Sequence, residues 1–498
     1  MRIVTKAAGT VLLLTGCSLI NSLDAVKPQA TDEDSGAHGG SGSGGKGGSA
    51  SGGKGGSLSD AGSGGSSGGN GGTSGSGGGG GTGGGATGGN GPVDSGNPDV
   101  FNPNNPAGAI VAYNKPTGTG APAPSLIVIS PTTGEILSSE PMNAVRGIVN
   151  DGITDRWYIF EQTTAMPTDP VKLHVRELDT ATGRWREIGS ATGLPVPAGR
   201  LVPLKDRLAY LSTPTPISPN PATHTLTILD VADPANITIF GGAAAANRPV
   251  LNGLRKAGMV GRPANNNPGG TLDVMGIAAT CDPLEGGVSG CDVTLASFTV
   301  NGANQFSAGP TKVVGQVDPK GTAQIDRDPG NADAVVVAFP SIPTVAELKP
   351  DCSSPNNPRK GSVEKFGPLD FSNVGQDPVP YTIVSENLTS AAFDTCLNVE
   401  FVGTQINDRA LWSIPLTPGG TTVHSCRGTG VGTLVFEPYT RTLIVVPTNS
   451  GLPEFYAVGG DASKVTLTAL SPPKLPSNNF APFGIVVRQP PGYKPKCN

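Results

Sequence analysis

From residue 107 onward, short segments alternate between apolar and polar residues, and turns rich in Gly, Pro, Asp or Asn join them in pairs. Alternation with a period of two is typical of β-strands with one buried face, and such turns predict hairpins. The copies are LIVISPTTGEIL from Leu126, LHVRELDTATGRWREI from Leu173, LTILDVADPANITI from Leu226, LASFTVNGANQFSAGPTKV from Leu295, LDFSNVGQDPVPYTIV from Leu369, LWSIPLTPGGTTVH from Leu411 and FYAVGGDASKVTL from Phe455. The pattern therefore predicts seven hairpins, the last three being looser copies.

A second kind of segment precedes several hairpins and is apolar at almost every position. These segments are RWYIFE from Arg156, RLAYLS from Arg207, ADAVVVAF from Ala332 and RTLIVVP from Arg441. A continuous apolar run of this length is typical of a strand that is buried on both faces. A fully buried strand followed by an outer hairpin is the order of strands in one blade of a β-propeller.

The spacing of the repeats supports this interpretation. The hairpins start 47, 53, 69, 74, 42 and 44 residues apart, and propeller repeats are about 40–50 residues long. We predict an all-β chain in which residues 107–498 form a β-propeller of seven four-stranded blades, although six or eight blades also fit. Residues 483–488 follow the last hairpin, and we expect them to pair with the first blade and close the ring. The alternative is a tandem array of β-sandwich modules of about 100 residues each.

Two stretches connect the repeats to known families. TATGRW and TLTILDVADPANI resemble the bacterial YVTN, LVIVD and quinoprotein-like propeller repeats, in which an Asp-x-x-Thr-Gly turn joins the outer strands. The resemblance covers most of residues 107–487 and implies a propeller. It carries over no cofactor residue, and we expect no cofactor.

The first sixteen residues have the parts of a secretory signal: basic Arg2 and Lys6, an apolar core, and small residues at the end. Leu14-Thr15-Gly16-Cys17 resembles the bacterial lipobox. This resemblance implies that the sulfur of Cys17 carries a diacyl lipid, that the chain is cut between Gly16 and Cys17, and that the new amino terminus is acylated. Ser18 follows where an Asp can mark inner-membrane retention, which favours the outer membrane in a Gram-negative cell.

Residues 17–106 form the expected tether between lipid and propeller. The chain has 74 Gly, and 30 of them lie between Gly39 and Gly91. Such a segment cannot bury enough apolar surface to offset its chain entropy, so we expect it to be disordered. As a flexible coil of about 90 residues it would span about 50 Å. The expected organisation is a signal peptide over 1–16, a lipidated tether over 17–106 and a propeller over 107–498.

Six cysteines remain when Cys17 is set aside, and an even number in an exported chain indicates three disulfides. Those six are Cys281, Cys291, Cys352, Cys396, Cys426 and Cys497. Cys281 and Cys291 bracket a Gly-rich loop between two apolar runs, so they are expected to face each other on paired strands. The other four allow three pairings, and we favour Cys352–Cys396 with Cys426–Cys497.

Charge and residue types exclude some functions. The formal net charge is -5 and aromatic residues make up 5% of the chain, with no clustered basic face, so we expect no nucleic-acid partner. His174 alternates with Lys172 and Arg176 and is predicted to face solvent. Three tryptophans lie in strands of the repeat, where we expect packing between blades: Trp157, Trp185 and Trp412.

The strongest metal candidate is a calcium loop, and it is weak. Its oxygen-bearing residues are Asp326, Asp328, Asn331 and Asp333, but Gly330 replaces one ligand and the bidentate Glu of a calcium-binding loop is missing. A simple turn has the same residue types, so the metal prediction is none.

The sequence as a whole predicts a lipoprotein of the cell envelope. The Cys17 lipid would hold it in the outer membrane, facing the periplasm or the medium, and its non-catalytic propeller would bind a protein or glycan partner. Two alternatives remain: a propeller hydrolase of lactonase-like or glycan-cleaving type, and a structural subunit of an envelope assembly. Carboxylates converging on the central channel would favour the hydrolase.

Overall fold

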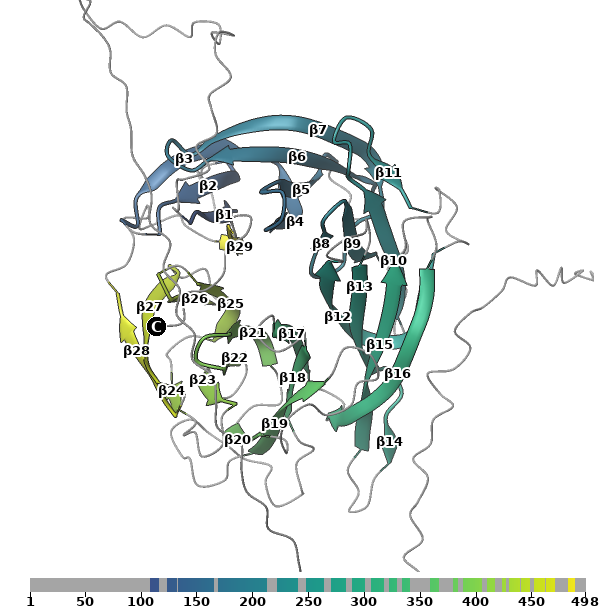
Figure 1. Cartoon of the computed structure of the whole chain (residues 1–498), viewed down its shortest axis with the longest axis vertical. Helices are drawn as coiled ribbons and strands as arrows, with labels where there is room; N and C mark the ends of the chain where they lie inside the picture. Colours follow the sequence, from purple (N-terminus) through teal and green to yellow (C-terminus); the bar gives the residue numbers. More distant parts are fainter. Residues whose placement is uncertain are drawn as a thin grey trace, which may run out of the picture. The chain divides into compact units, whose positions relative to one another are not determined.

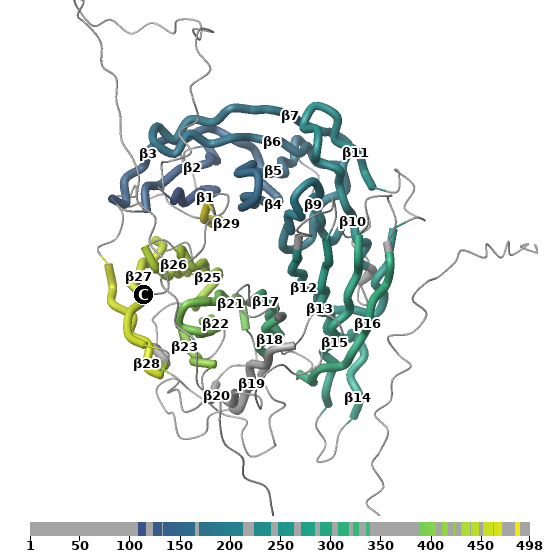
Figure 2. The backbone as a smooth tube through the Cα atoms, in the orientation of Figure 1, coloured from purple at the N-terminus to yellow at the C-terminus, as the bar shows by residue number. Residues whose placement is uncertain are grey.

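The computed structural model describes most of residues 108–488 (Figures 1 and 2). All described residues belong to one compact unit. No helix among them is long and apolar enough to cross a membrane. The described ranges are 108–115, 123–131, 133–164, 169–212, 222–240, 248–263, 270–283, 289–300, 306–317, 322–328, 334–340, 359–366, 379–383, 388–404, 410–416, 423–426, 430–438, 440–447, 452–461, 463–470 and 482–488.

Antiparallel strands build seven blades, and the strands of each blade are named from the innermost outward (Figure 1). Blade 1 consists of β29 (Pro482–Val487), β1 (Ile110–Asn114), β2 (Ser125–Ile129) and β3 (Ile136–Pro141). Blade 2 consists of β4 (Ala144–Asn150), β5 (Trp157–Gln162), β6 (Val171–Asp179) and β7 (Arg184–Leu194). Blade 3 consists of β8 (Val202–Leu204), β9 (Arg207–Ser212), β10 (Ala222–Asp230) and β11 (Thr238–Ile239). Blade 4 consists of β12 (Val250–Pro263), β13 (Gly270–Ala278), β15 (Ser289–Val300) and β16 (Phe306–Val317), with the short β14 (Asp282–Pro283) paired to β15.

The remaining three blades follow the same order. Blade 5 consists of β17 (Gln324–Asp328), β18 (Ala334–Pro340), β19 (Arg359–Phe366) and β20 (Val379–Ile383). Blade 6 consists of β21 (Leu388–Asp394), β22 (Val399–Thr404), β23 (Ala410–Pro415) and β24 (Val423–Cys426). Blade 7 consists of β25 (Val431–Glu437), β26 (Thr442–Pro447), β27 (Glu454–Asp461) and β28 (Lys464–Ala469). The predicted seven-bladed β-propeller is confirmed, and tandem β-sandwiches are not formed.

Seven apolar clusters fill the seams between neighbouring blades. Each cluster combines side chains from two consecutive blades, and the cluster between blades 7 and 1 completes the circle. The innermost strands also contact one another in the same order around the ring. Because each sheet packs against a neighbour on both faces, the second strand of most blades is apolar at nearly every position, as the sequence predicted.

The ring closes where the end of the chain meets its beginning. β29 pairs with β1, from Val487 opposite Ile110 to Pro482 opposite Asn114, which confirms the role expected for residues 483–488. Arg488 follows this strand and makes two hydrogen bonds to Asp155 in the first turn of blade 2, at 2.8 and 2.5 Å. Both side chains are almost fully buried.

The predicted Asp-x-x-Thr-Gly turn is present between the outer strands of blade 2. Asp179 accepts the backbone N–H of Ala181 at 3.0 Å and the hydroxyl of Thr182. Gly183 has a φ of 70°, and an added Cβ would clash with Leu137 of blade 1. The turn therefore needs glycine both for its conformation and for the approach of the neighbouring blade.

The fifth hairpin differs from the prediction. The structure pairs Arg359–Phe366 with Val379–Ile383, whereas the sequence pattern placed the first strand at the run that begins with Leu369. Residues 367–378 lie outside the described residues. The strand RKGSVEKF has few apolar residues, so the hydrophobic pattern did not mark it as a strand.

Replacing Arg488 with Met is expected to destabilise the ring strongly. The substitution leaves the buried Asp155 carboxylate without its cation, which costs about 3–5 kcal/mol. Denaturant unfolding of the full chain measures the loss. Arg186→Met is the matched control: Arg186 is 65% exposed in its pair with Glu177, so its loss should cost less than about 1 kcal/mol. Equal effects of the two substitutions would contradict a closing role for the Arg488 pair.

Candidate functional site at the start of the inner strands

All seven inner strands run in the same direction, so the beginnings of these strands collect at one end of the ring, which we call the start end. Because the strands alternate in direction, the connections between the second and third strands of each blade also lie at this end. The two long insertions between repeats, over residues 279–288 and 341–358, are connections of this kind. Loops carried by a rigid scaffold are common positions for binding residues, so the start end is the candidate site.

Basic residues gather at the start end. Arg146 lies in the first half of β4, Arg200 lies two residues before β8, and Arg255 and Lys256 open the part of β12 that belongs to blade 4. We call these four residues the cationic row. An acid lies at the same end: Asp326 is the third residue of β17, as Arg146 is the third residue of β4.

β12 is built so that Arg255 and Lys256 are held at the start end. Its first part pairs with β10 of blade 3, and its second part pairs with β13 of blade 4. The strand bends between these parts at Gly253, which has a φ of 72° and accepts the backbone N–H of Ala279 at 2.7 Å. The pairing then shifts by one residue between Leu254 and Lys256, so Arg255 is the extra residue of a β-bulge.

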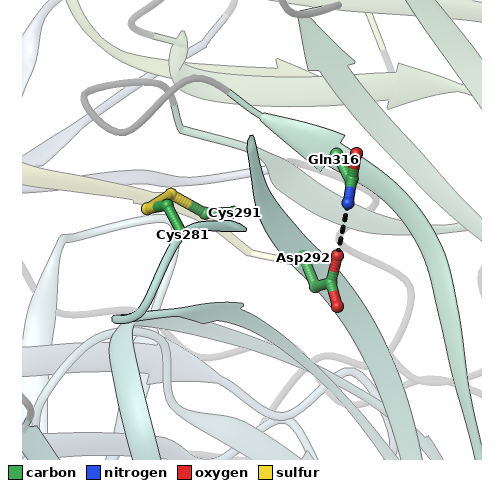
Figure 3. The surroundings of a disulfide bond; sticks show 4 residues. All are labelled: Cys281, Cys291, Asp292 and Gln316. Carbon is green, nitrogen blue, oxygen red and sulfur yellow. Dashed lines mark hydrogen bonds between the residues drawn. A yellow bond between two sulfur atoms is a disulfide. The ribbon is translucent and has the colours of Figure 1, made fainter. Parts of the chain in front are cut away.

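A disulfide fixes the connection beside this bulge. Cys281 and Cys291 are bonded, with their Cα atoms 4.1 Å apart, on the paired segments that flank the loop (Figure 3). Nearby, the side-chain amide of Gln316 on β16 donates to Asp292 on β15 at 2.8 Å (Figure 3). The predicted Cys281–Cys291 bond is confirmed. It links the end of β13, the partner of the bulge, to the third strand of the blade.

The cations of the row differ in their surroundings. Burial lowers the pKa of Lys256, and the neighbouring charge of Arg255 lowers it further. Arg146 donates to the neutral side-chain carbonyl of Gln162 at 2.8 Å. Arg200 is 59% exposed and lies 3.4 Å from a carboxylate oxygen of Asp326. Burial raises the pKa of Asp326 even though Arg200 opposes the shift. Within the part of the chain that the structure describes, Arg146 and Lys256 therefore have no carboxylate partner.

The residues of the weak calcium candidate occupy a strand end and the connection after it. Asp326 and Asp328 belong to β17, and Asp326 accepts both the Arg200 guanidinium and the backbone N–H of Arg327. The side chain of Asp328 and the whole of Asn331 and Asp333 lie outside the described residues. Across the described ranges, no group of three His, Cys, Asp or Glu side chains could hold a metal ion.

Acidic residues at the opposite end of the inner strands serve in turns. Asp151 accepts the backbone N–H of Ile153 at 2.9 Å, and Asp394 accepts that of Cys396 at 2.9 Å. Asp394 also pairs with Arg441 of blade 7 at 2.7 Å. Glu437 accepts the backbone N–H of Thr440 at 2.7 Å. Each of these carboxylates accepts a hydrogen bond from a backbone N–H group of its own turn, so the three do not point to a shared centre.

His174 is buried, so the expectation that it faces solvent was wrong. It lies on the third strand of blade 2, and the strands on either side cover it with carboxylates. Its Nε2 lies 2.9 Å from Glu161 on β5, and its Nδ1 lies 3.0 Å from Glu187 on β7. Arg176, on the same face, reaches Glu140 of blade 1 at 2.8 Å. This polar group therefore belongs to the seam between blades 1 and 2.

The histidine changes the acidity of both glutamates. Burial raises the pKa of Glu161, but hydrogen bonds from His174 and Asn143 outweigh it and hold the pKa below the ordinary 4.5. Burial also raises the pKa of Glu187, and the hydrogen bond from His174, with the nearby charges of Lys172 and Arg176, lowers it overall. Both carboxylates are thus stabilised in their ionised form.

The other predicted residues divide into three groups. Trp157 and Trp185 meet edge-to-face at 5.5 Å between blades 1 and 2, and Trp412 packs between blades 5 and 6, as predicted. Cys396 is disulfide-bonded, whereas Cys352, Cys497 and the side chain of Cys426 lie outside the described residues. Gly16 and Cys17 lie outside them as well. The pairings Cys352–Cys396 and Cys426–Cys497 stay predictions.

The cationic row was missed from the sequence. Arg255 and Lys256 are adjacent in VLNGLRKAGMV, where alternation would place them on opposite faces of a strand. Their placement together depends on the bulge and on the bend at Gly253, neither of which the hydrophobic pattern predicts. A basic pair after a glycine inside an otherwise apolar segment is the signal that could have indicated them.

Comparisons with known proteins extend only to the fold. No protein-family model and no curated protein matches the chain. A proposed 6-phosphogluconolactonase from Bacteroides fragilis is 8% identical over 78% of this chain and 99% of its own, with a TM-score of 0.46. A protein from Lactobacillus plantarum is 12% identical over 77% and 99%, with a TM-score of 0.44. AztD from Citrobacter koseri is 11% identical over 76% and 97%, with a TM-score of 0.42. The propeller assignment rests on the strand pairing of this chain itself.

His174→Gln is expected to change how stability depends on pH. Glu161 and Glu187 have lowered pKa values in the folded protein, so they contribute stability that is present above pH 4.5 and is lost as the pH falls through those values. The variant should therefore be less stable than the parent at neutral pH, and the difference should shrink below pH 4.5. Denaturant midpoints across the pH range measure it.

His224→Gln is the matched control, because burial alone lowers the pKa of His224 below 6.5. Its difference from the parent should change as the pH falls below 6.5, not below 4.5. If the two variants share one pH profile, the carboxylate contacts of His174 are not the cause.

Proposed function

We propose that the protein is an exported lipoprotein, anchored through Cys17, whose propeller binds a ligand in the cell envelope or outside the cell without catalysis. The lipobox-like Leu14–Cys17 segment and the Gly-rich tether support the anchoring part. Three acyl chains would hold the chain firmly, since one chain of myristoyl length binds a membrane only weakly. A tether of about 50 Å would let the propeller reach a partner away from the bilayer.

The chemistry of the inner strands is the observation that carries the non-catalytic part. A hydrolase of this fold would need carboxylates, histidines or a metal at the channel. The described residues near the start of the inner strands include Arg146, Arg200, Arg255 and Lys256, and the one acid among them, Asp326, lies 3.4 Å from Arg200. At the other ends, Asp151, Asp394 and Glu437 accept hydrogen bonds from turns. This arrangement favours a binding role over the hydrolase alternative.

Features of the start end support it as the place where a ligand binds. It carries the cationic row and the disulfide-fixed connection of blade 4. A ring of seven blades holds these elements in fixed positions, as a binding surface requires. At the opposite end, the described carboxylates of Asp151, Asp394 and Glu437 accept hydrogen bonds from turns.

Cys17→Ser should abolish lipid attachment and release the protein into the soluble fraction. The measurement is incorporation of labelled palmitate, together with fractionation of membranes and soluble contents in a bacterial host. Ser18→Asp keeps the cysteine and is the control: it should stay lipidated but, in a Gram-negative host, remain with the inner membrane. Membrane retention of the Cys17→Ser protein, without label, would contradict the anchoring proposal.

A further inference from the structure

Cys396 is disulfide-bonded, and the position of its turn in the ring limits which cysteine is its partner. It is half-buried in the turn that joins β21 to β22 in blade 6, at the end of the ring opposite the start end. The Cys281–Cys291 bond and the proposed lipid on Cys17 leave three candidates: Cys352, Cys426 and Cys497.

The register of blade 6 excludes Cys426. Its backbone pairs with Ala410, at the beginning of β23. The turn of Cys396 lies beside the other end of that strand, where the backbone N–H of Leu416 donates to the carbonyl of Asn398 at 2.8 Å. About 20 Å of extended strand separates Ala410 from Leu416. Because the Cα atoms of a disulfide lie within about 7 Å of each other, Cys396 and Cys426 cannot be bonded.

Cys352 belongs to a connection at the wrong end of the ring. This connection joins β18 to β19, and both of its ends, Pro340 and Arg359, lie at the start end. The chain from Cys352 to Arg359 spans at most about 25 Å when fully extended. It would have to cover the length of β21, about 23 Å, and also the width from the third strand of blade 5 to the inner strand of blade 6. Only a fully extended path around the apolar seam of these blades would bring Cys352 to Cys396.

The tail that follows the closing strand starts at the right end of the ring. β29 ends at Val487, and Arg488 then pairs with Asp155 in a turn at the same end as the turn of Cys396. The inner strands of blades 1, 7 and 6 contact one another in this order, so about 20 Å separates the first from the last at about 10 Å between packed sheets. The segment QPPGYKPKC after Arg488 contains three prolines. Such a Pro-rich segment covers about 28 Å, which is enough for Cys497 to reach blade 6.

We propose that Cys396 and Cys497 form a disulfide that ties the tail to blade 6 and holds the closing strand in blade 1. This pairing takes the place of the one favoured from the sequence, and it leaves Cys352 and Cys426, both assigned to the start end by the strand order, to bond with each other. Formation of the bond removes two electrons and two protons from the two thiols, and the disulfide of an oxidoreductase outside the cytoplasm accepts them and becomes a dithiol. The assignment therefore rests on the export in the proposed function.

Peptide mapping of the full chain without reduction tests the pairing. Free thiols are first alkylated, and trypsin then separates the four cysteines onto the peptides 328–359, 366–409, 410–427 and 497–498. We expect mass spectrometry to find 366–409 joined to 497–498, and reduction to split this species into its two parts. Alkylated Cys497, or 366–409 joined to either of the other two peptides, would overturn the assignment.

The stabilising role is tested with the double variant Cys396→Ser/Cys497→Ser. The proposed bond closes a loop of about 100 residues that contains blade 7 and β29, and the stabilisation by a disulfide grows with the length of the loop it closes. Cys281→Ser/Cys291→Ser is the matched control, since its bond joins residues 10 positions apart. We expect the first double variant to have the lower midpoint in denaturant. A midpoint equal to that of the parent would show that the bond does not hold the ring closed. The mapping uses the parent chain, so it decides the pairing even where a variant does not fold.

Two preparations separate this assignment from the proposed export. One is the protein isolated from membranes of an expressing bacterial host. The other is the full chain made by cell-free synthesis under reducing conditions and then oxidised with glutathione disulfide in non-ionic detergent. A Cys396–Cys497 bond in the second preparation alone supports the pairing and contradicts export. Its absence from both overturns the pairing and leaves the anchoring through Cys17 intact, because the palmitate label reports on that separately.

Discussion

Each blade of this propeller has two apolar faces, so every blade needs a neighbour on both sides. Six seams form between blades that follow one another in the sequence, and the seventh must join the two ends of the folded chain. β29 supplies that join by entering blade 1 beside β1, and Arg488 then pairs with the buried Asp155 of blade 2. The stability of the whole ring depends on this closure, because an open ring would expose an apolar sheet face at each end.

The position of the inner strands in the ring explains why their sequences differ from those of the other strands. An inner strand has one paired edge and one edge toward the channel, and it is crowded by the inner strands of both neighbours. Small or polar residues are accepted there, as in AVRGIVN of β4 and LTSAAFD of β21. Cations can therefore be placed on these strands without disrupting the apolar seams, whereas the second strands are apolar at nearly every position and the buried Arg207 of β9 is paired with Asp230.

Six of the seven hairpins and the closing strand could be predicted from the sequence. Their side chains alternate between buried and exposed environments, and their turns use Asp, Gly and Pro. The other six inner strands could not, since their sequences carry neither continuous apolar runs nor clear alternation. His174 was assigned to solvent because alternation along one strand says nothing about the carboxylates on the two flanking strands. The cationic row was missed for a related reason: a bulge and a bend, not a period, bring Arg255 and Lys256 together.

The start of blade 4 has firm local supports of covalent and backbone kind. They are the Cys281–Cys291 disulfide, the hydrogen bond from Ala279 to Gly253, and the pairing of β12 with both β10 and β13. Acids in the turns at the opposite end accept hydrogen bonds within those turns. The β12 bulge is therefore fixed by bonds between strands and between cysteines, whereas the turns at the opposite end are held by their own side chains.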